Sequence, residues 1–343
     1  MTGVVKVKSA VLDVLRIVGN KVIDETLVIV VASKLAKHTE QMNHRWTVLR
    51  NTWSLTKRHI LFVRDYSDLK LLQHDVVSSV EFIVFLGEPT RSIVRYVYKL
   101  DYLICKDEMQ DFRQHFKTKY KFSYIGHIFA IPDKQPTYNM LTEWLVCNIF
   151  ALQTISTIST NYFEPPHVVV FDMDSTLITD EEEVRIRDPA IYAALDELKT
   201  YNCVLCLWSY GDREHVVESL NKVGLGNYFK IILSGGRRVG EYKLDEEEDR
   251  RYNVLYDSTP FYLNMTHVKN IPKSPRVVLW YLINHNIVFF KSITLVDDLF
   301  DNNIYYDNFV NLNTCPVPVN DWDKWHSRIL RYIVQYDNMF NRC

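Results

Sequence analysis

The sequence predicts an α/β protein: a parallel sheet with helices on both faces in the C-terminal half, preceded by a mostly helical N-terminal half. From residue 166 onward, short apolar runs alternate with helix-like segments, a pattern typical of parallel strands joined by crossover helices. Hydrophobic residues make up 47% of the 343 residues, enough for a sizeable core. Two prolines in NYFEPPH at 161–167 mark the expected boundary between domains at 1–165 and 166–343.

The N-terminal half is expected to be mostly helical, and it contains no recognisable catalytic motif. The segment 24–41 has the acidic start and basic last turn of a helix, and 91–116 has apolar residues at helical spacing. The apolar segment 141–156 is also expected to be a helix. VEFIVFLGEP at 80–89 and YIGHIFAIPD at 124–133 are each either a strand or a helix end stopped by Gly or Pro. We expect this half to bind a partner or to mediate oligomerisation.

The C-terminal half alternates strands and helices in order. Strands are expected at 167–172, 203–209, 230–234, 292–298 and 309–313, and helices at 188–200, 212–225, 274–286 and 321–340. The first of these helices begins with Asp and Pro, which are favoured at a helix start. A polar stretch at 235–272 is a modest insertion in this pattern.

The carboxyl ends of the predicted strands carry the polar residues with the clearest chemical potential. Asp172 ends the first strand and Asp174 lies just beyond it. Ser209 ends the second strand, and Asp297 and Asp298 end the strand at 292–298. Ligands of open parallel sheets bind outside this edge, so we expect these side chains to form one site.

Phosphoryl transfer through a carboxylate fits this set of residues. Asp172 would be the nucleophile, and Asp174 would protonate the leaving oxygen and later accept a proton from water. Mg²⁺ would be held by Asp172, by Asp297 and by the backbone carbonyl of Asp174. Ser209 would hydrogen-bond a phosphoryl oxygen, and Lys273, at the start of the helix at 274–286, would offset the phosphate charge.

Three further residues have two interpretations each. Asp298 is either a second metal ligand at the same strand end or a residue that orients the lysine or caps a helix. Thr176 either stabilises the turn below the nucleophile or contacts substrate, and Ser175 has the same two interpretations. The sequence leaves these alternatives open.

The C-terminal half resembles the haloacid-dehalogenase-like (HAD) phosphohydrolases. DMDST at 172–176 matches their first motif, Ser209 after Trp the second, Lys273 the third and LVDD at 295–298 the fourth, in matching order over 167–313. The resemblance implies a Mg²⁺-dependent phosphatase that forms an aspartyl phosphate. It also implies the nucleophile, acid, lysine and metal-ligand roles given above.

DMDSTL is also similar to the first motif of the phosphatases that act on a polymerase carboxy-terminal domain. Those enzymes place their lysine in a segment that HVKNI at 267–271 imitates, so Lys269 is a rival for Lys273. We favour Lys273 because KSP opens the helix before the fourth motif.

The whole chain is similar to the 38K proteins of baculoviruses, which combine a helical N-terminal half with DMDST, WSYG, KSPRVVLWYL and LVDD. This resemblance implies a HAD-type protein-serine/threonine phosphatase needed for nucleocapsid assembly, located in the virion nucleocapsid and the host nucleus. It further implies a basic DNA-packaging protein as substrate and other nucleocapsid proteins as partners. A homo-oligomer is compatible with the apolar N-terminal half, although no feature requires one.

The composition points to a soluble, intracellular protein. No signal peptide is visible, and the longest apolar run, LVIVVA at 27–32, is too short to span a bilayer. The six cysteines show no paired framework. Cys203 and Cys206 form a CxxC within a predicted strand, where residues three apart point to opposite faces, so we expect no metal or redox role there.

Two other functions remain open from the sequence. Residues 1–165 carry a net charge of +5 and 166–343 of −7, so a basic N-terminal half could hold nucleic acid for a nucleic-acid end phosphatase, with strong salt dependence. A non-catalytic HAD-fold scaffold is the other alternative, although a scaffold would not need both aspartates of the first motif.

Acidic runs at 179–183 and 245–251 either guide a basic substrate or are solvated surface. Only about 30 residues separate the first two motifs, which suggests an open site suited to a protein side chain.

Overall fold

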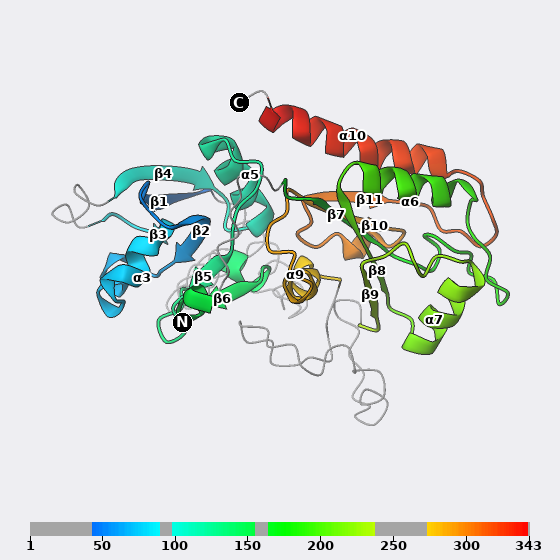
Figure 1. Cartoon of the computed structure of the whole chain (residues 1–343), viewed down its shortest axis with the longest axis horizontal. Helices are drawn as coiled ribbons and strands as arrows, with labels where there is room; N and C mark the ends of the chain where they lie inside the picture. Colours follow the sequence, from blue (N-terminus) through cyan, green and yellow to red (C-terminus); the bar gives the residue numbers. More distant parts are fainter. Residues whose placement is uncertain (1–42, 90–97, 155–163, 237–272, 342–343) are drawn as a thin grey trace, which may run out of the picture. The chain divides into compact units, whose positions relative to one another are not determined.

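The computed structural model describes residues 43–89, 98–154, 164–236 and 273–341 (Figure 1). These residues belong to one compact unit, Asn43–Cys343. The predicted helix at 24–41, the rival Lys269 and the acidic run at 245–251 lie outside the described residues. In the part of the chain that is described, no helix combines the length and apolar character needed to cross a membrane.

The N-terminal region is built on a six-stranded mixed sheet in the order β4-β1-β3-β2-β5-β6. Strand β1 is antiparallel to β3 and β4, while the pairs β2–β3, β2–β5 and β5–β6 are parallel. The strands are β1 (His44–Arg50), β2 (Thr56–Phe62), β3 (Val80–Leu86), β4 (Lys99–Cys105), β5 (Ile128–Ala130) and β6 (Val146–Asn148). The helices are α3 (His74–Ser79) and α5 (Met109–Tyr120), with 3₁₀ turns η1 (Tyr66–Leu71), η2 (Asn139–Thr142) and η3 (Ile149–Thr154).

The prediction of a mostly helical N-terminal half is therefore wrong. The segment 91–116 contains strand β4 followed by α5, and 141–156 contains the end of η2, strand β6 and η3. In β4, Leu103 and Cys105 are buried while Ile104 is 62% exposed, which is the two-residue alternation of a strand. The apolar residues of the following helix α5 do have helical spacing, so the strand and the helix together looked like one helix. Periodicity alone cannot assign a short apolar run to a strand or a helix.

The C-terminal sheet has five strands in the order β11-β10-β7-β8-β9, and every pair in it is parallel. The parallel sheet of the C-terminal half was predicted correctly. Its strands are β7 (His167–Phe171), β8 (Cys203–Ser209), β9 (Ile231–Ser234), β10 (Ile293–Asp297) and β11 (Asn308–Asn311). Its helices are α6 (Ala190–Thr200), α7 (Arg213–Lys222), α9 (Pro275–Asn284) and α10 (Trp322–Asn341), with a 3₁₀ turn η6 (Phe300–Asn302) after β10.

The two faces of the parallel sheet belong to two different core clusters. Val169 and Phe171 of β7 pack in a cluster with side chains of α6, α7 and α10. Val168 and Val170 pack in a second cluster, with α9 and with residues of the N-terminal sheet. Continuous burial on both faces explains why β7 is an uninterrupted apolar run.

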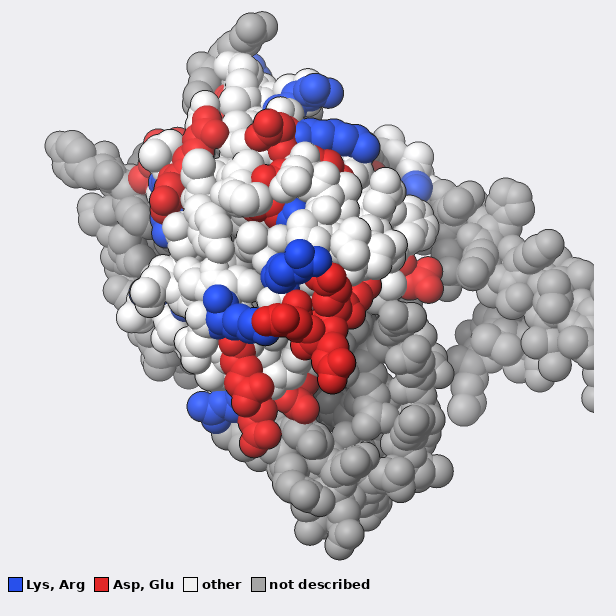
Figure 2. Space-filling view, turned by 90° about the vertical axis from the view of Figure 1, so that its right-hand side faces the viewer, with Lys and Arg blue, Asp and Glu red and all other residues white. Residues whose placement is uncertain are grey.

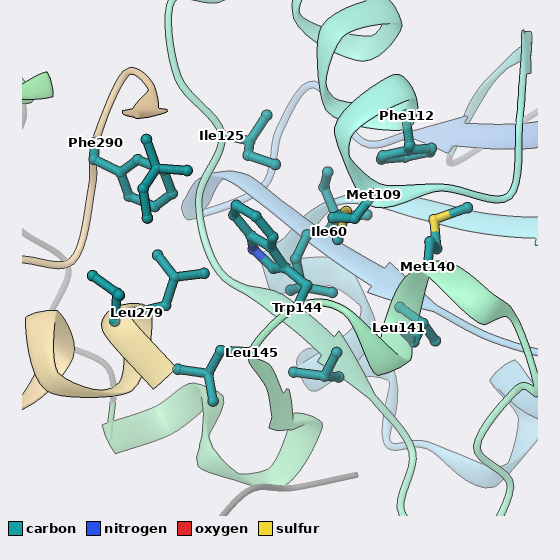
Figure 3. Close-up of a cluster of buried hydrophobic side chains, with 14 of the residues drawn as sticks. Ile60, Met109, Phe112, Ile125, Met140, Leu141, Trp144, Leu145, Leu279 and Phe290 are labelled. Carbon is teal, nitrogen blue, oxygen red and sulfur yellow. The ribbon is translucent and has the colours of Figure 1, made fainter. Parts of the chain in front are cut away.

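Packing continues from the N-terminal sheet through α9 to the parallel sheet. Trp144 and Leu145 belong to the same cluster as Leu279 of α9 and Phe290 (Figure 3). The division of the chain into domains at 1–165 and 166–343 stays a prediction.

Strand β8 carries the CxxC pair on its two faces. Cys203 lies in one core cluster and Cys206 in the other, as expected for residues three apart in a strand. Both are buried free cysteines, and burial raises the pKa of the Cys203 thiol to about 12.

Candidate functional site

The carboxyl ends of three adjacent parallel strands bring the predicted site residues together. Asp172 directly follows β7, Ser209 is the last residue of β8 and Asp297 is the last residue of β10. The backbone N–H of Asp172 donates to the carbonyl of Val296 at 2.9 Å, so the two carboxylates leave neighbouring strands side by side. All three side chains are buried.

Lys273 lies between two of these carboxylates. Its Nζ contacts the Asp172 carboxylate and lies 2.9 Å from Oδ2 of Asp297. The side chains of Lys273, Asp172 and Asp297 are 1%, 8% and 0% exposed. Ser274 caps α9, accepting a hydrogen bond from the backbone of Arg276, and this fixes where the chain turns just after Lys273.

Tyr210 supports the lysine from the side of β8. Its ring centroid lies 4.7 Å from Nζ of Lys273, and its hydroxyl accepts a hydrogen bond of 3.2 Å from the Lys273 backbone. The same hydroxyl donates to Oδ1 of Asn302 at 2.9 Å. The Asn302 amide donates in turn to both oxygens of Asp297, at 3.1 and 2.9 Å. This chain of hydrogen bonds fixes the Lys273 backbone relative to the Asp297 carboxylate.

Burial and mutual attraction set the protonation of this group. Burial raises the pKa of Asp172 above its ordinary value, against the opposing effect of Lys273. Burial disfavours the Lys273 ammonium, but Asp172 and Asp297 outweigh it and raise the pKa of Lys273. Burial and the neighbouring Asp297 raise the pKa of Asp298 to about 6. Lys273 is therefore a permanent cation at neutral pH.

Three carboxylates in this group can hold a metal ion. Asp172, Asp297 and Asp298 each offer an oxygen, and these atoms lie within 4.8 Å of one another. Carboxylate oxygens are the ligands that Mg²⁺ prefers. The Lys273 ammonium can balance only one of the three carboxylates, and a divalent cation would favour the ionised form of the others against the burial that raises the pKa of Asp172 and Asp298. The donor set therefore fits Mg²⁺, while the predicted role of the Asp174 carbonyl as a ligand stays a prediction.

Asp174 faces α7 instead of the lysine. Its Oδ2 accepts a hydrogen bond of 2.8 Å from the Ser209 hydroxyl, and its Oδ1 lies 2.6 Å from Nε2 of His215. The Asp174 side chain is 37% exposed, so it lies at the mouth of the site. Ser209 was expected to bind a phosphoryl oxygen; in the structure its hydroxyl bonds Asp174 and accepts from the backbone of Gly211 at 2.9 Å.

The turn after β7 is fixed by both of its hydroxyl residues. Thr176 donates to Oδ2 of Asp172 at 3.1 Å, which corresponds to the interpretation of this residue as support for the nucleophile. Ser175 has a φ of +57°, a left-handed conformation that is uncommon for residues other than glycine. Its hydroxyl donates to Asp180 and its carbonyl accepts from Nη1 of Arg187 at 3.0 Å. These contacts stabilise the backbone that places Asp174.

Arg187 is fully buried and connects this turn to α10. Its Nε and Nη2 donate to the two oxygens of Asp321 at 2.8 and 3.0 Å. Asp321 precedes α10 directly, and Arg187 also donates to the carbonyl of Asn313 after β11. The turn that carries Ser175 is thus tied to two later segments of the chain.

The acidic run at 179–183 forms the tip of a short hairpin beside the site. Ile178 and Ile186 form an antiparallel bridge. At the tip, Glu181 pairs with Arg185 and Glu183 with Lys222. Acidic side chains gather on the right-hand face of the molecule, with a few Lys and Arg beside them (Figure 2). Both interpretations of this run, as a substrate guide or as solvated surface, remain.

The sequence reasoning missed His215, Tyr210, Asn302 and Arg187. His215 lies in the first turn of α7, six residues after Ser209, and that proximity was a signal that could have been used. Tyr210 adjoins Ser209 in the same motif. Asn302 and Arg187 act through contacts that depend on the folded chain, and no local pattern marks them. Lys273 lies just before α9, where the sequence places it, and its rival Lys269 lies outside the described residues.

A family model described as "Protein of unknown function (DUF705)" matches residues 44–341. The chain belongs to this family. An uncharacterized 41.0 kDa protein of Cryptophlebia leucotreta granulosis virus is 76% identical over 340 residues, 99% of each chain. An uncharacterized 38.0 kDa protein of Autographa californica nuclear polyhedrosis virus is 38% identical over 316 residues, 87% of this chain and 98% of the other. The chain is thus related to baculovirus proteins of about 38 kDa, as the sequence suggested.

Two solved structures of low similarity align with about half of the chain. A putative beta-phosphoglucomutase from Thermotoga maritima has a TM-score of 0.30 at 13% identity, over 49% of this chain and 99% of the other. The core domain of a putative phosphoglycolate phosphatase from Streptococcus pneumoniae has a TM-score of 0.28 at 12% identity, over 50% and 98%. Scores this low carry no argument about activity, which must be inferred from the site itself.

Proposed function

We propose that the chain is a Mg²⁺-dependent phosphomonoesterase that acts through an aspartyl phosphate on Asp172. One observation carries this proposal: the buried Lys273 ammonium bridges Asp172 and Asp297 beside Asp298, at the carboxyl edge of a parallel sheet. A structural ion pair would need one carboxylate, whereas Lys273 contacts two buried carboxylates with the half-buried Asp298 beside them, an arrangement that is costly for stability. Such an excess of buried charge is typical of a functional site.

The first half of the reaction forms the covalent intermediate. A carboxylate oxygen of Asp172 attacks the phosphorus, and the bond from phosphorus to the leaving oxygen breaks. Asp174 donates a proton to that leaving oxygen, which departs as an alcohol. Lys273, next to Asp172, offsets the charge of the phosphoryl group. Thr176 holds the second oxygen of Asp172, so the attacking oxygen is the one on the side of the lysine.

The second half regenerates the enzyme. Asp174, now ionised, accepts a proton from a water molecule that attacks the phosphorus of the acyl phosphate. The bond between phosphorus and Asp172 breaks, and inorganic phosphate leaves. The hydroxyl of Ser209, which bonds Asp174 in the free protein, can turn to a phosphoryl oxygen once substrate is bound.

Asp172, Asp297 and Asp298 would hold the Mg²⁺ ion, with Asn302 orienting Asp297. When bound, the ion supplies positive charge that neutralises the carboxylates and the phosphate together. Without that charge the three carboxylates would repel the phosphate of the substrate. The oxygen-only donor set distinguishes this site from typical zinc sites, which include His or Cys ligands.

The substrate we propose is phosphoserine or phosphothreonine in a basic, DNA-packaging viral protein, dephosphorylated during nucleocapsid assembly in the host nucleus. Support comes from the resemblance to the 38K proteins and from the acidic hairpin tip at 179–183 beside the site. Surface charge of this kind raises the rate at which oppositely charged partners associate. The arginine and lysine that pair with Glu181 and Glu183 reduce the effect but do not abolish it.

The test is Mg²⁺-dependent hydrolysis of 4-nitrophenyl phosphate by the wild type, Asp172→Asn and Asp196→Asn. Asp196 lies on the exposed side of α6, so its variant is the matched control and should keep wild-type activity. Loss of the nucleophile should lower kcat by at least about 10³-fold. Equal activity in wild type and Asp172→Asn would exclude Asp172 as nucleophile.

Two further outcomes separate the alternatives. No activity in any variant, with Mg²⁺ present, would favour the scaffold function. Preference for 3′-phosphorylated DNA over a basic phosphopeptide, with binding that falls steeply with salt, would favour a nucleic-acid end phosphatase.

A further inference from the structure

We propose that His215 is a positioning residue for Asp174. Its imidazole and the Ser209 hydroxyl fix the plane of the Asp174 carboxyl group in the free protein, and the imidazole keeps Oδ1 in place when Oδ2 carries the proton for the leaving group. This inference rests on the proposed phosphatase function and names a residue outside the four sequence motifs.

The contact engages both oxygens of one carboxylate. Oδ2 of Asp174 accepts from Ser209 at 2.8 Å, and Oδ1 lies 2.6 Å from Nε2 of His215. We assign the proton of this pair to Nε2, which donates to Oδ1, so the proton that Asp174 passes to the leaving oxygen is carried on Oδ2, which becomes free when the Ser209 hydroxyl turns to the substrate. A carboxylate held at one oxygen can still rotate, whereas one held at both oxygens has a fixed plane. Precise orientation of this kind contributes strongly to rate, because small displacements of a catalytic group are costly.

The backbone around His215 is fixed by the start of α7. Asp212 caps the helix, and its side chain accepts a hydrogen bond of 2.8 Å from the backbone N–H of His215. The next residue, Val216, is 1% exposed and packs in the core cluster with α6 and α10. His215 therefore projects from a rigid first turn, one side of which is anchored in the core.

Gly211 leaves the space that the imidazole occupies. A Cβ atom at Gly211 would lie 2.7 Å from Cδ2 of His215 and 3.1 Å from Oγ of Ser209. Both distances are shorter than an ordinary carbon contact, so any side chain here would displace the two groups that hold Asp174. No left-handed backbone requires the glycine at this position. Close packing of the imidazole and the hydroxyl accounts for it.

The His215–Asp174 pair adds little to the stability of the fold. The two side chains are 41% and 37% exposed, and pairs with this exposure contribute little to stability. Their effect is local instead. The hydrogen bonds from His215 and Ser209 fix the direction in which the Asp174 side chain points.

The test compares a good and a poor leaving group with full-length protein and Mg²⁺. Hydrolysis of 4-nitrophenyl phosphate needs little help from an acid, because 4-nitrophenolate is a stable anion, whereas phenyl phosphate depends on protonation of its leaving oxygen. General acid catalysis contributes about 10²–10⁴-fold. We expect His215→Ala to lower kcat for phenyl phosphate by about 30-fold or more, and for 4-nitrophenyl phosphate by less than about 5-fold. Asp174→Asn should show the same pattern with a larger loss.

Three companion variants sharpen the result. His215→Gln places an amide nitrogen near the position of Nε2 and should restore part of the phenyl phosphate rate. Gly211→Ala keeps the histidine but displaces it, so it should reproduce the leaving-group pattern of His215→Ala. Glu218→Ala, on the exposed side of α7, is the matched control and should leave both rates unchanged. Thermal unfolding of each variant checks that the fold is intact.

The outcomes separate this inference from the function on which it rests. Equal losses on both substrates in His215→Ala would indicate a structural role and overturn the proposal, and so would no loss on either. A leaving-group pattern in Asp174→Asn but not in His215→Ala would overturn the role of His215 alone. A wild type without Mg²⁺-dependent hydrolysis would overturn the proposed function and this inference with it.

Discussion

Replacing Lys273 by methionine tests whether one ammonium holds two buried carboxylates. The change removes the charge and keeps most of the side-chain volume. Lys273 and Asp297 are 1% and 0% exposed and Asp172 is 8% exposed, so water cannot replace the lost partner. Removing one member of a buried ion pair costs about 3–5 kcal/mol. We expect a loss of that size in the free energy of unfolding at pH 8, without Mg²⁺.

The loss should depend on pH in a defined direction. Lys273 lowers the pKa of Asp172 against the effect of burial, so its removal raises that pKa further. A carboxyl whose pKa is higher in the folded than in the unfolded state costs stability as pH rises above its ordinary value of about 4. The variant should therefore be closest to the wild type near pH 5 and increasingly less stable toward pH 8.

Urea denaturation followed by tryptophan fluorescence gives the free energy of unfolding for each variant. Lys291→Met is the matched control, because Lys291 is also buried but pairs with Glu164 and Asp337, which are 68% and 28% exposed. Its carboxylates keep their water, so the expected cost is about 1 kcal/mol or less. Equal costs for the two variants, or no pH dependence for Lys273→Met, would refute the reasoning.

Three further predictions follow from the site and its surroundings. Asn302→Ala removes the amide that donates to both oxygens of Asp297, and it should lower the Mg²⁺ affinity about 10- to 100-fold. The affinity is measured from the Mg²⁺ dependence of hydrolysis, and an unchanged affinity would contradict the role of Asn302. Arg187→Met leaves Asp321 and the Ser175 carbonyl without their buried donor. It should lower the free energy of unfolding, measured by urea denaturation, by about 3 kcal/mol. A change below about 1 kcal/mol would mean that water replaces those hydrogen bonds. Burial, reinforced by His127, lowers the pKa of His59 to about 3, and burial lowers the pKa of His127 to about 4. The unfolded chain binds protons at these histidines near pH 6.5, whereas the folded chain does not. The free energy of unfolding should therefore be highest above pH 6.5 and fall toward pH 4. In His59→Gln, thermal unfolding should show a shallower fall over that range, and an identical slope would be evidence against the buried neutral histidine.

The sequence determined the parallel sheet and the motif residues at its edge. Asp172 directly follows the apolar run of strand β7, and Asp297 is the last residue of the apolar strand β10. A strand buried on both faces reads as a continuous apolar run, and the topology of parallel strands brings their carboxyl ends to one edge. These signals are local in the chain, so they could be read without the fold.

The N-terminal sheet could not be recognised in the same way. Strands β5 and β6 have three residues each, too few for a periodic pattern. Strand β5 pairs with β2, which lies some 70 residues earlier, and β6 pairs with β5. Tertiary pairing overrides local preference in such short segments.

The details of the site also depend on contacts between distant segments. His215 meets Asp174 across 41 residues, and Arg187 meets Asp321 across 134. The spacing of residues along the chain contains no information on such pairs, because a side chain on the first turn of a helix can face any strand end that packing brings near it. The sequence by itself determined which chemistry the strand ends could support. Only the tertiary structure decided that His215 contacts Asp174 and that Lys273 joins Asp172 to Asp297, since both depend on how α7 and α9 pack against the sheet.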